Sequence, residues 1–127
     1  MFIGYISLDD VNQCLAAETA EEYGATMDFF ASQAELPVVP CDAVVYDLDN
    51  LPRDDRRHIL NELAAGPAKR LSAVHSYNLS PLDAEALRRN GVLVRRRLQR
   101  SWLTHLIRGK TGRGIAQQLP SPAKYST

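Results

Sequence analysis

The chain has 127 residues, which suffices for one domain and excludes a second of useful size, since domains take roughly 100 to 200 residues. Apolar residues make up 45% and charged residues 24%, a globular composition that excludes collagen-like, coiled-coil and fully disordered chains. No stretch approaches the roughly 18 apolar residues that cross a bilayer, and no basic segment precedes the first apolar run. These features predict a cytoplasmic protein.

The net charge of zero conceals two parts of opposite charge. Residues 1–85 hold 15 acidic and 5 basic side chains, whereas residues 86–127 hold 10 basic and no acidic side chains. Side chains of one sign repel each other unless something opposes them. The basic third is therefore expected to face the acidic part of the same molecule, that of a second copy, or an external polyanion.

Five short, mostly apolar runs predict strands, because strands buried on both faces of a parallel sheet lack polar alternation. They cover residues 2–8, 25–31, 43–48, 71–74 and 92–94. Apolar residues at helical spacing predict helices between the runs, over the residues from Ser7 to Gly24, 54–65, 81–90 and 101–107. Two prolines between the second and third strands predict a loop with at most one turn.

Local signals set the expected helix ends. Ser7 followed by Asp10 predicts a capping box, and Val11 and Cys14 fall at positions that would face the core. Ser80 and Pro81 give the clearest helix start, and Gly109 is expected to stop the last helix. Cys14 and Cys41 show no metal or disulfide spacing, so buried reduced thiols are predicted.

The alternation of strands and helices predicts an α/β fold with a doubly wound, five-stranded parallel sheet. Such sheets place function at the carboxyl ends of their strands. Three acids, Asp9, Asp10 and Asp47, would meet there, with Ser76 and Arg96 nearby. Clustered carboxylates require a cation such as Mg²⁺ or an arginine, and a carboxylate so placed can accept a phosphoryl group.

Several segments, in the same order along the chain, resemble the receiver domain of two-component response regulators. Residues 42–48 with Leu51 and Pro52 are similar to the family's third strand and its phosphoacceptor aspartate, and residues 73–77 and 90–98 are similar to its fourth and fifth strands. The resemblance covers residues 1–108 and implies a flavodoxin-like receiver topology with strand order 2-1-3-4-5. The second helix would be short or missing, and residues 109–127 are expected to form a flexible basic tail.

The resemblance implies roles for individual residues. Asp47 would be the phosphoacceptor, and Asp9, Asp10 and the backbone carbonyl of Asp49 would hold Mg²⁺ as the candidate cofactor. The family's Ser or Thr switch falls on Ser76 or on His75, and Arg96 stands where the family has a lysine. Asp47 as a strand cap or as a partner of Arg96, and Asp9 and Asp10 as helix caps, are the structural alternatives.

The departures from the family are as informative as the match. Ser7 and Leu8 occupy the positions of the family's metal-binding acidic pair, which leaves Asp9 and Asp10 slightly late in the chain. Arginine also presents a planar fork where lysine presents a compact ammonium group. These differences favour an atypical receiver, or pseudo-receiver, over an active member of a phosphorelay.

The function predicted is a stand-alone signalling module, active through phosphorylation of Asp47 or degenerate and independent of phosphate. The resemblance implies protein partners, among them a histidine kinase or a second copy in a homodimer. They would bind the face made by residues 81–90, 92–94 and 101–107, the family's fourth helix, fifth strand and fifth helix. The alternative function is a nucleic-acid-binding module that uses the basic C-terminal third. An enzyme is not predicted, because the sequence has neither a glycine-rich phosphate loop nor a nucleophile elbow.

Overall fold

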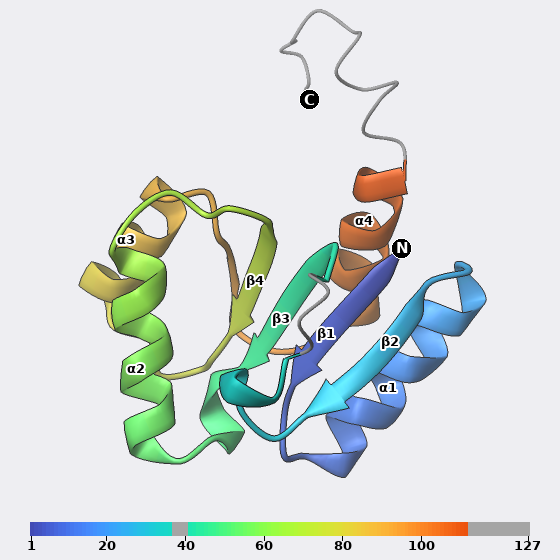
Figure 1. Ribbon diagram of the computed structural model, residues 1–127, viewed down its shortest axis with the longest axis horizontal. Coiled ribbons are helices and arrows are strands. Elements are labelled where there is room, and N and C mark those ends of the chain that lie inside the picture. Colours follow the sequence, from blue (N-terminus) through green and yellow to red (C-terminus); the bar gives the residue numbers. More distant parts are fainter. Residues whose placement is uncertain (37–40, 112–127) are drawn as a thin grey trace, which may run out of the picture.

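The computed structural model describes residues 1–36 and 41–111 and shows a parallel sheet with helices on both faces (Figure 1). The strands are β1 (Phe2–Ile6), β2 (Thr26–Phe30), β3 (Ala43–Asp47), β4 (Leu71–His75) and β5 (Leu93–Arg95). The helices are α1 (Asp10–Glu22), α2 (Arg53–Ala64), α3 (Pro81–Arg89) and α4 (Arg100–Thr111). The order β2-β1-β3-β4-β5, with all pairs parallel, confirms the predicted topology. No helix in these two ranges is long and apolar enough to cross a membrane.

Two hydrophobic clusters hold the helices on the sheet. On one face, Tyr5 and Val45 pack with Leu103 and Ile107, so that α4 lies beside α1. On the other face, α2 and α3 cover a cluster that includes Tyr46. Burial raises the pKa of the Tyr46 hydroxyl to about 12. Because side chains alternate along each strand, consecutive residues of β1 and β3 serve opposite faces, which explains their nearly continuous apolar sequence.

The link between β2 and β3 contains no α-helix among its described residues. A single 3₁₀ turn, η1 (Gln33–Glu35), follows β2, as the loop prediction of at most one turn required. The two prolines that motivated this prediction lie within residues 37–40, outside the described residues. The expectation of a short or missing second helix is confirmed for the part of this link that the structure describes.

Four local predictions are wrong, three in α1 and one in α4. Asp9, not Ser7, caps α1, because its carboxylate accepts the Asn12 N–H at 2.8 Å. The buried side of α1 comprises Ala16, Thr19 and Ala20, which leaves Cys14 and Val11 exposed.

The last helix is also longer than expected. It continues past Gly109 to Thr111, because glycine weakens a helix without ending it unless the backbone turns left-handed. The remainder of the predicted tail, from residue 112 on, lies outside the described residues.

Candidate functional site

The strand register brings three polar residues side by side at the carboxyl edge of the sheet. Asp47 ends β3 directly opposite His75, the last residue of β4. Ser7 follows β1, whose last residue Ile6 pairs with Tyr46. All three polar side chains are buried, with Asp47 only 1% exposed. This edge is where a doubly wound sheet is expected to carry its site.

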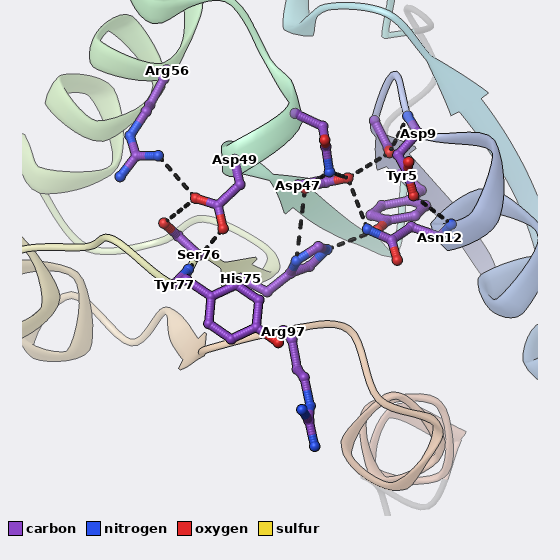
Figure 2. A network of polar contacts seen from close by, with 12 residues as sticks. Tyr5, Asp9, Asn12, Asp47, Asp49, Arg56, His75, Ser76, Tyr77 and Arg97 are labelled. Carbon is purple, nitrogen blue, oxygen red and sulfur yellow. Dashed lines mark hydrogen bonds and ion pairs between the residues drawn. The ribbon is translucent and has the colours of Figure 1, made fainter.

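Neighbouring side chains occupy both oxygens of the Asp47 carboxylate (Figure 2). Oδ2 accepts hydrogen bonds from Ser7 Oγ at 2.8 Å, Asn12 Nδ2 at 3.1 Å and Asn50 Nδ2 at 2.9 Å. Oδ1 accepts from the same Asn50 amide at 3.1 Å, and His75 Nδ1 lies 3.8 Å away. The three hydrogen-bond donors come from three different segments, so the carboxylate connects the ends of β1 and β3 with the start of α1.

A buried pair of rings extends this network beneath Asp47. The Tyr5 hydroxyl and His75 Nε2 share a hydrogen bond of 2.7 Å. Burial lowers the pKa of His75, and the neighbouring acids, Asp47 first, oppose that shift only in part. Burial followed by the charge of Asp47 raises the pKa of Tyr5 far above its ordinary value. A neutral His75 with its proton on Nδ1 directs that N–H toward Asp47 and leaves Nε2 to accept from Tyr5.

Asp49 forms a second, separate cluster, distinct from that of Asp47 in Figure 2. Its carboxylate accepts from Ser76 Oγ at 2.6 Å, from the Tyr77 N–H at 2.8 Å and from Arg56 Nη1 at 3.0 Å. Burial raises the pKa of Asp49, but these three hydrogen bonds and the charge of Arg56 outweigh it and hold the pKa below its ordinary value. The hydroxyl of Ser76 thus bonds Asp49 and not the carboxylate of Asp47.

The residues expected to hold Mg²⁺ are engaged elsewhere or turned outward. One carboxylate oxygen of Asp9 accepts the hydrogen bond that caps α1, and Asp10 is an exposed residue in the first turn of that helix. Within residues 1–36 and 41–111 no group of three or more acidic, His or Cys side chains could hold a metal ion. The residues present therefore do not fit the Mg²⁺ site that the resemblance implied.

Arg96, in the lysine position, also lies apart from Asp47. Its guanidinium carbon stands 6.0 Å from the centre of the Tyr77 ring, a cation–π arrangement. Asp47 has no ion pair with an arginine among the described residues, and the neighbouring Arg97 extends away from it (Figure 2). The alternative in which Arg96 pairs with Asp47 does not hold.

Sequence reasoning missed most of the partners of Asp47. Ser7 was assigned to a helix cap, and Asn12, Asn50 and Tyr5 were not identified at all. Asn50 lies three residues after Asp47 and Asn12 lies in the first turn of a helix that follows a strand, so both could have been considered as amide donors. Tyr5 carried no such signal, because a tyrosine within a buried strand usually serves the core.

No family model matches the chain, and none of the curated proteins matches it. Solved structures do match. A response regulator receiver protein from Pseudoalteromonas atlantica has a TM-score of 0.69 and 11% identity, over 90% of this chain and 99% of that chain. The phosphorylated cyanobacterial phytochrome response regulator RcpA has a TM-score of 0.61 and 17% identity, over 94% and 98%. The ChxR receiver domain of Chlamydia trachomatis has a TM-score of 0.58 and 14% identity, over 87% and 97%.

These likenesses show that the chain has the receiver fold. They span nearly the whole of each matched receiver, in agreement with the resemblance drawn from the strand-end segments. At identities this low a similar structure shows the fold alone, so the chemistry of the site follows only from the residues themselves.

Proposed function

We propose that this chain is a receiver-like signalling module that binds a protein partner without phosphorylation of Asp47. The observation that carries the proposal is the enclosure of the Asp47 carboxylate. A phosphoacceptor must present one oxygen to the incoming phosphorus in line with the leaving group. Here both oxygens are held by Ser7, Asn12 and Asn50, and the side chain is 1% exposed.

The charges around Asp47 support the same proposal. Phosphoryl transfer depends on cations that neutralise the developing negative charge. Arg96 lies over the Tyr77 ring, Arg56 is bound to Asp49, and the described residues contain no group of three or more acidic, His or Cys side chains that could hold Mg²⁺. The hydroxyl of Ser76, a candidate switch, is likewise bound to Asp49. In this proposal the Asp47 network stabilises the carboxyl edge of the sheet and carries out no chemistry.

The face formed by α3, β5 and α4 is the proposed partner surface. A groove of about 670 Å³ runs along it, with apolar walls that include Leu71 and Leu106 and with Arg88, Arg95 and His105 among its lining residues. Apolar area at the centre with cations around it suits a partner that offers an apolar anchor within an acidic surface. The acidic residues of a second copy would also satisfy this description, and a homodimer is one form that the proposal takes.

The proposal is tested by adding beryllofluoride and Mg²⁺, which together mimic an aspartyl phosphate. Trp102 is the only tryptophan of the chain, and its ring lies 6.2 Å from that of His75, so its fluorescence reports on changes at Asp47. We expect no change at millimolar Mg²⁺. A saturable change that is lost in Asp47→Asn would overturn the proposal and make the chain a phosphorylatable receiver.

The partner surface has its own test. Arg88→Glu reverses an exposed charge at the groove and is expected to weaken partner binding or self-association, as measured by sedimentation velocity. Arg53→Glu, an exposed charge reversal on α2, is the control and should leave association unchanged. Equal effects of the two variants would place the partner elsewhere on the molecule.

A further inference from the structure

Three consecutive arginines at the end of β5 have no acidic partner in the part of the chain that the structure describes. Arg95, Arg96 and Arg97 are all exposed, and the described residues provide no carboxylate within ion-pair distance of any of them. The segments outside the described residues contain no Asp or Glu.

The contacts that these arginines do make are with neutral groups. Arg95 Nη1 donates to the Val94 carbonyl at 2.9 Å, and Arg96 lies over the Tyr77 ring. With the Gln99 amide turned so that its oxygen faces Arg97, the Arg97 guanidinium donates to that oxygen at 3.1 Å. No carboxylate among the described residues therefore neutralises their positive charges.

The position in the fold increases this unbalanced charge. Only Leu98 and Gln99 separate the arginines from α4, a helix with no acidic residue in its first turn, and a helix N-terminus itself carries partial positive charge. Arg100 adds a fourth cation, although Glu22 pairs with it. Like charges gathered at a helix N-terminus repel one another, so an anion bound among them would stabilise the arrangement.

A cavity lies where this charge accumulates. Its volume is about 480 Å³, and it is lined by Tyr77, the three arginines and Gln99. Small-molecule sites commonly measure roughly 300 to 1,000 Å³. The cavity also lies at the carboxyl ends of β4 and β5, the edge of the sheet where doubly wound folds bind their ligands.

Tyr77 gives the cavity an aromatic wall that is held in place. The residue is 54% exposed, yet its N–H donates to Asp49 and the preceding Ser76 N–H donates to the Arg95 carbonyl at 3.0 Å. An exposed aromatic ring next to guanidinium groups offers a stacking surface for a base together with donors for phosphates. We propose that this cavity binds a nucleotide, with its base on Tyr77 and its phosphates on Arg96 and Arg97.

The experiment uses the full chain and compares GTP, ATP, inorganic tripolyphosphate and guanosine by isothermal titration and Trp102 fluorescence. Trp102 Nε1 donates to the Arg97 carbonyl at 2.8 Å, so its emission is sensitive to occupancy of the cavity. We expect at least one of the nucleotides to bind about tenfold more tightly than tripolyphosphate, because only a nucleotide also stacks. Guanosine alone, which carries no phosphate, should bind more weakly than any of the three anions.

Variants separate the stacking contact from the charge. Tyr77→Ala should remove the advantage of the nucleotide over tripolyphosphate, whereas Arg97→Ala should weaken both by about tenfold. Arg89→Ala removes an exposed charge on α3 outside the cavity and should change neither. Each of these side chains is exposed, and thermal unfolding of each variant checks that the fold is retained.

Three results would overturn the proposal. One is equal affinity for nucleotides and tripolyphosphate that Tyr77→Ala leaves unchanged, which would mean binding by charge alone. Another is the absence of any response up to millimolar nucleotide. The third is tight binding of a single-stranded RNA by a protein that does not bind GTP or ATP, which would favour a nucleic-acid surface in place of a nucleotide cavity.

Discussion

The polar side chains at the carboxyl edge of the sheet mainly form hydrogen bonds with one another. Asp47 receives hydrogen bonds from residues that follow β1, begin α1 and follow β3, so one buried carboxylate connects three segments. Ser7 has two tasks there, since its hydroxyl donates to Asp47 and accepts the Asp9 N–H at 3.1 Å. A buried polar group that loses its partner costs more than an ordinary hydrogen bond contributes.

Ser7→Ala is therefore expected to lower the free energy of unfolding by about 1 to 3 kcal/mol, because it leaves both Asp47 and the Asp9 N–H short of a partner. Urea denaturation measures this loss. Ser101→Ala, an exposed serine on α4, is the matched control and should change stability by no more than about 0.5 kcal/mol. A loss no larger than that of the control would mean that the Asp47 network contributes little to the fold.

His75 makes stability depend on pH. Its pKa in the folded protein lies below its ordinary value of 6.5, because burial disfavours the charged ring. As the pH falls below about 6.5 the unfolded chain binds the proton first, so the free energy of unfolding decreases until the folded pKa is passed. We expect the stability of wild type relative to His75→Gln to shrink between pH 8 and pH 5.

Denaturation midpoints across this pH range measure the effect, and His105→Gln provides the control. His105 is exposed on α4, so the control variant should retain the pH dependence of the wild type. A parallel decline of wild type and His75→Gln would show that acidic groups, not the buried imidazole, govern the stability in this range.

At the scale of the elements, local sequence patterns predict that a helix or strand is present but do not always predict the residue at which it begins or ends. All five strands were predicted from short apolar runs, because burial on both faces leaves a signature in the sequence itself. The cap of α1 was assigned to the wrong residue, since Ser7 and Asp9 are both good caps and only the neighbouring strand decides that Ser7 is used for Asp47. Helix α4 continues past Gly109 because this glycine does not adopt the left-handed conformation that would end the helix.

Gly91, which follows a helix, and Gly109, which lies inside one, should respond in opposite directions to alanine. Gly91 follows α3 with φ +86°, a left-handed conformation that costs an L-residue about 1 to 2 kcal/mol, so Gly91→Ala is expected to destabilise the protein by that amount. Gly109 lies inside α4 with open space where a Cβ would be placed, so Gly109→Ala should stabilise by about 0.5 to 1 kcal/mol. Thermal denaturation distinguishes the two signs, and a loss in Gly109→Ala would argue against a continuous helix there.

For the whole molecule, connectivity determined what the sequence could predict. Alternating strands and helices limit the topology to few choices, and the order of the five strands follows from those limits and the receiver resemblance. The site was predicted less well, because the directions in which Asp49, Ser76 and Arg96 point depend on partners distant in sequence. The separation of charge was evident in the sequence, but which arginines lack partners emerged only from the fold.

That separation of charge permits a test between a protein partner and a nucleic acid. If Arg88, Arg89, Arg95 and Arg100 all neutralised phosphates of a DNA duplex, log affinity would fall with log salt at a slope near −3.6, from about 0.9 per phosphate. Two of these four are already paired, Arg89 with Glu85 and Arg100 with Glu22, and the acidic residues of the first 85 positions repel a polyanion.

We therefore expect mixed-sequence DNA to bind more weakly than micromolar at physiological salt and with a shallower slope. A protein partner in the apolar groove would show a shallow dependence too, because salt screens charges at its rim while apolar contacts to Leu106 persist. Fluorescence anisotropy of labelled DNA across a salt series measures the slope. Tight binding with a slope near −3.6, lost when Arg95 and Arg96 are both replaced by alanine, would favour a nucleic-acid-binding module over the signalling role.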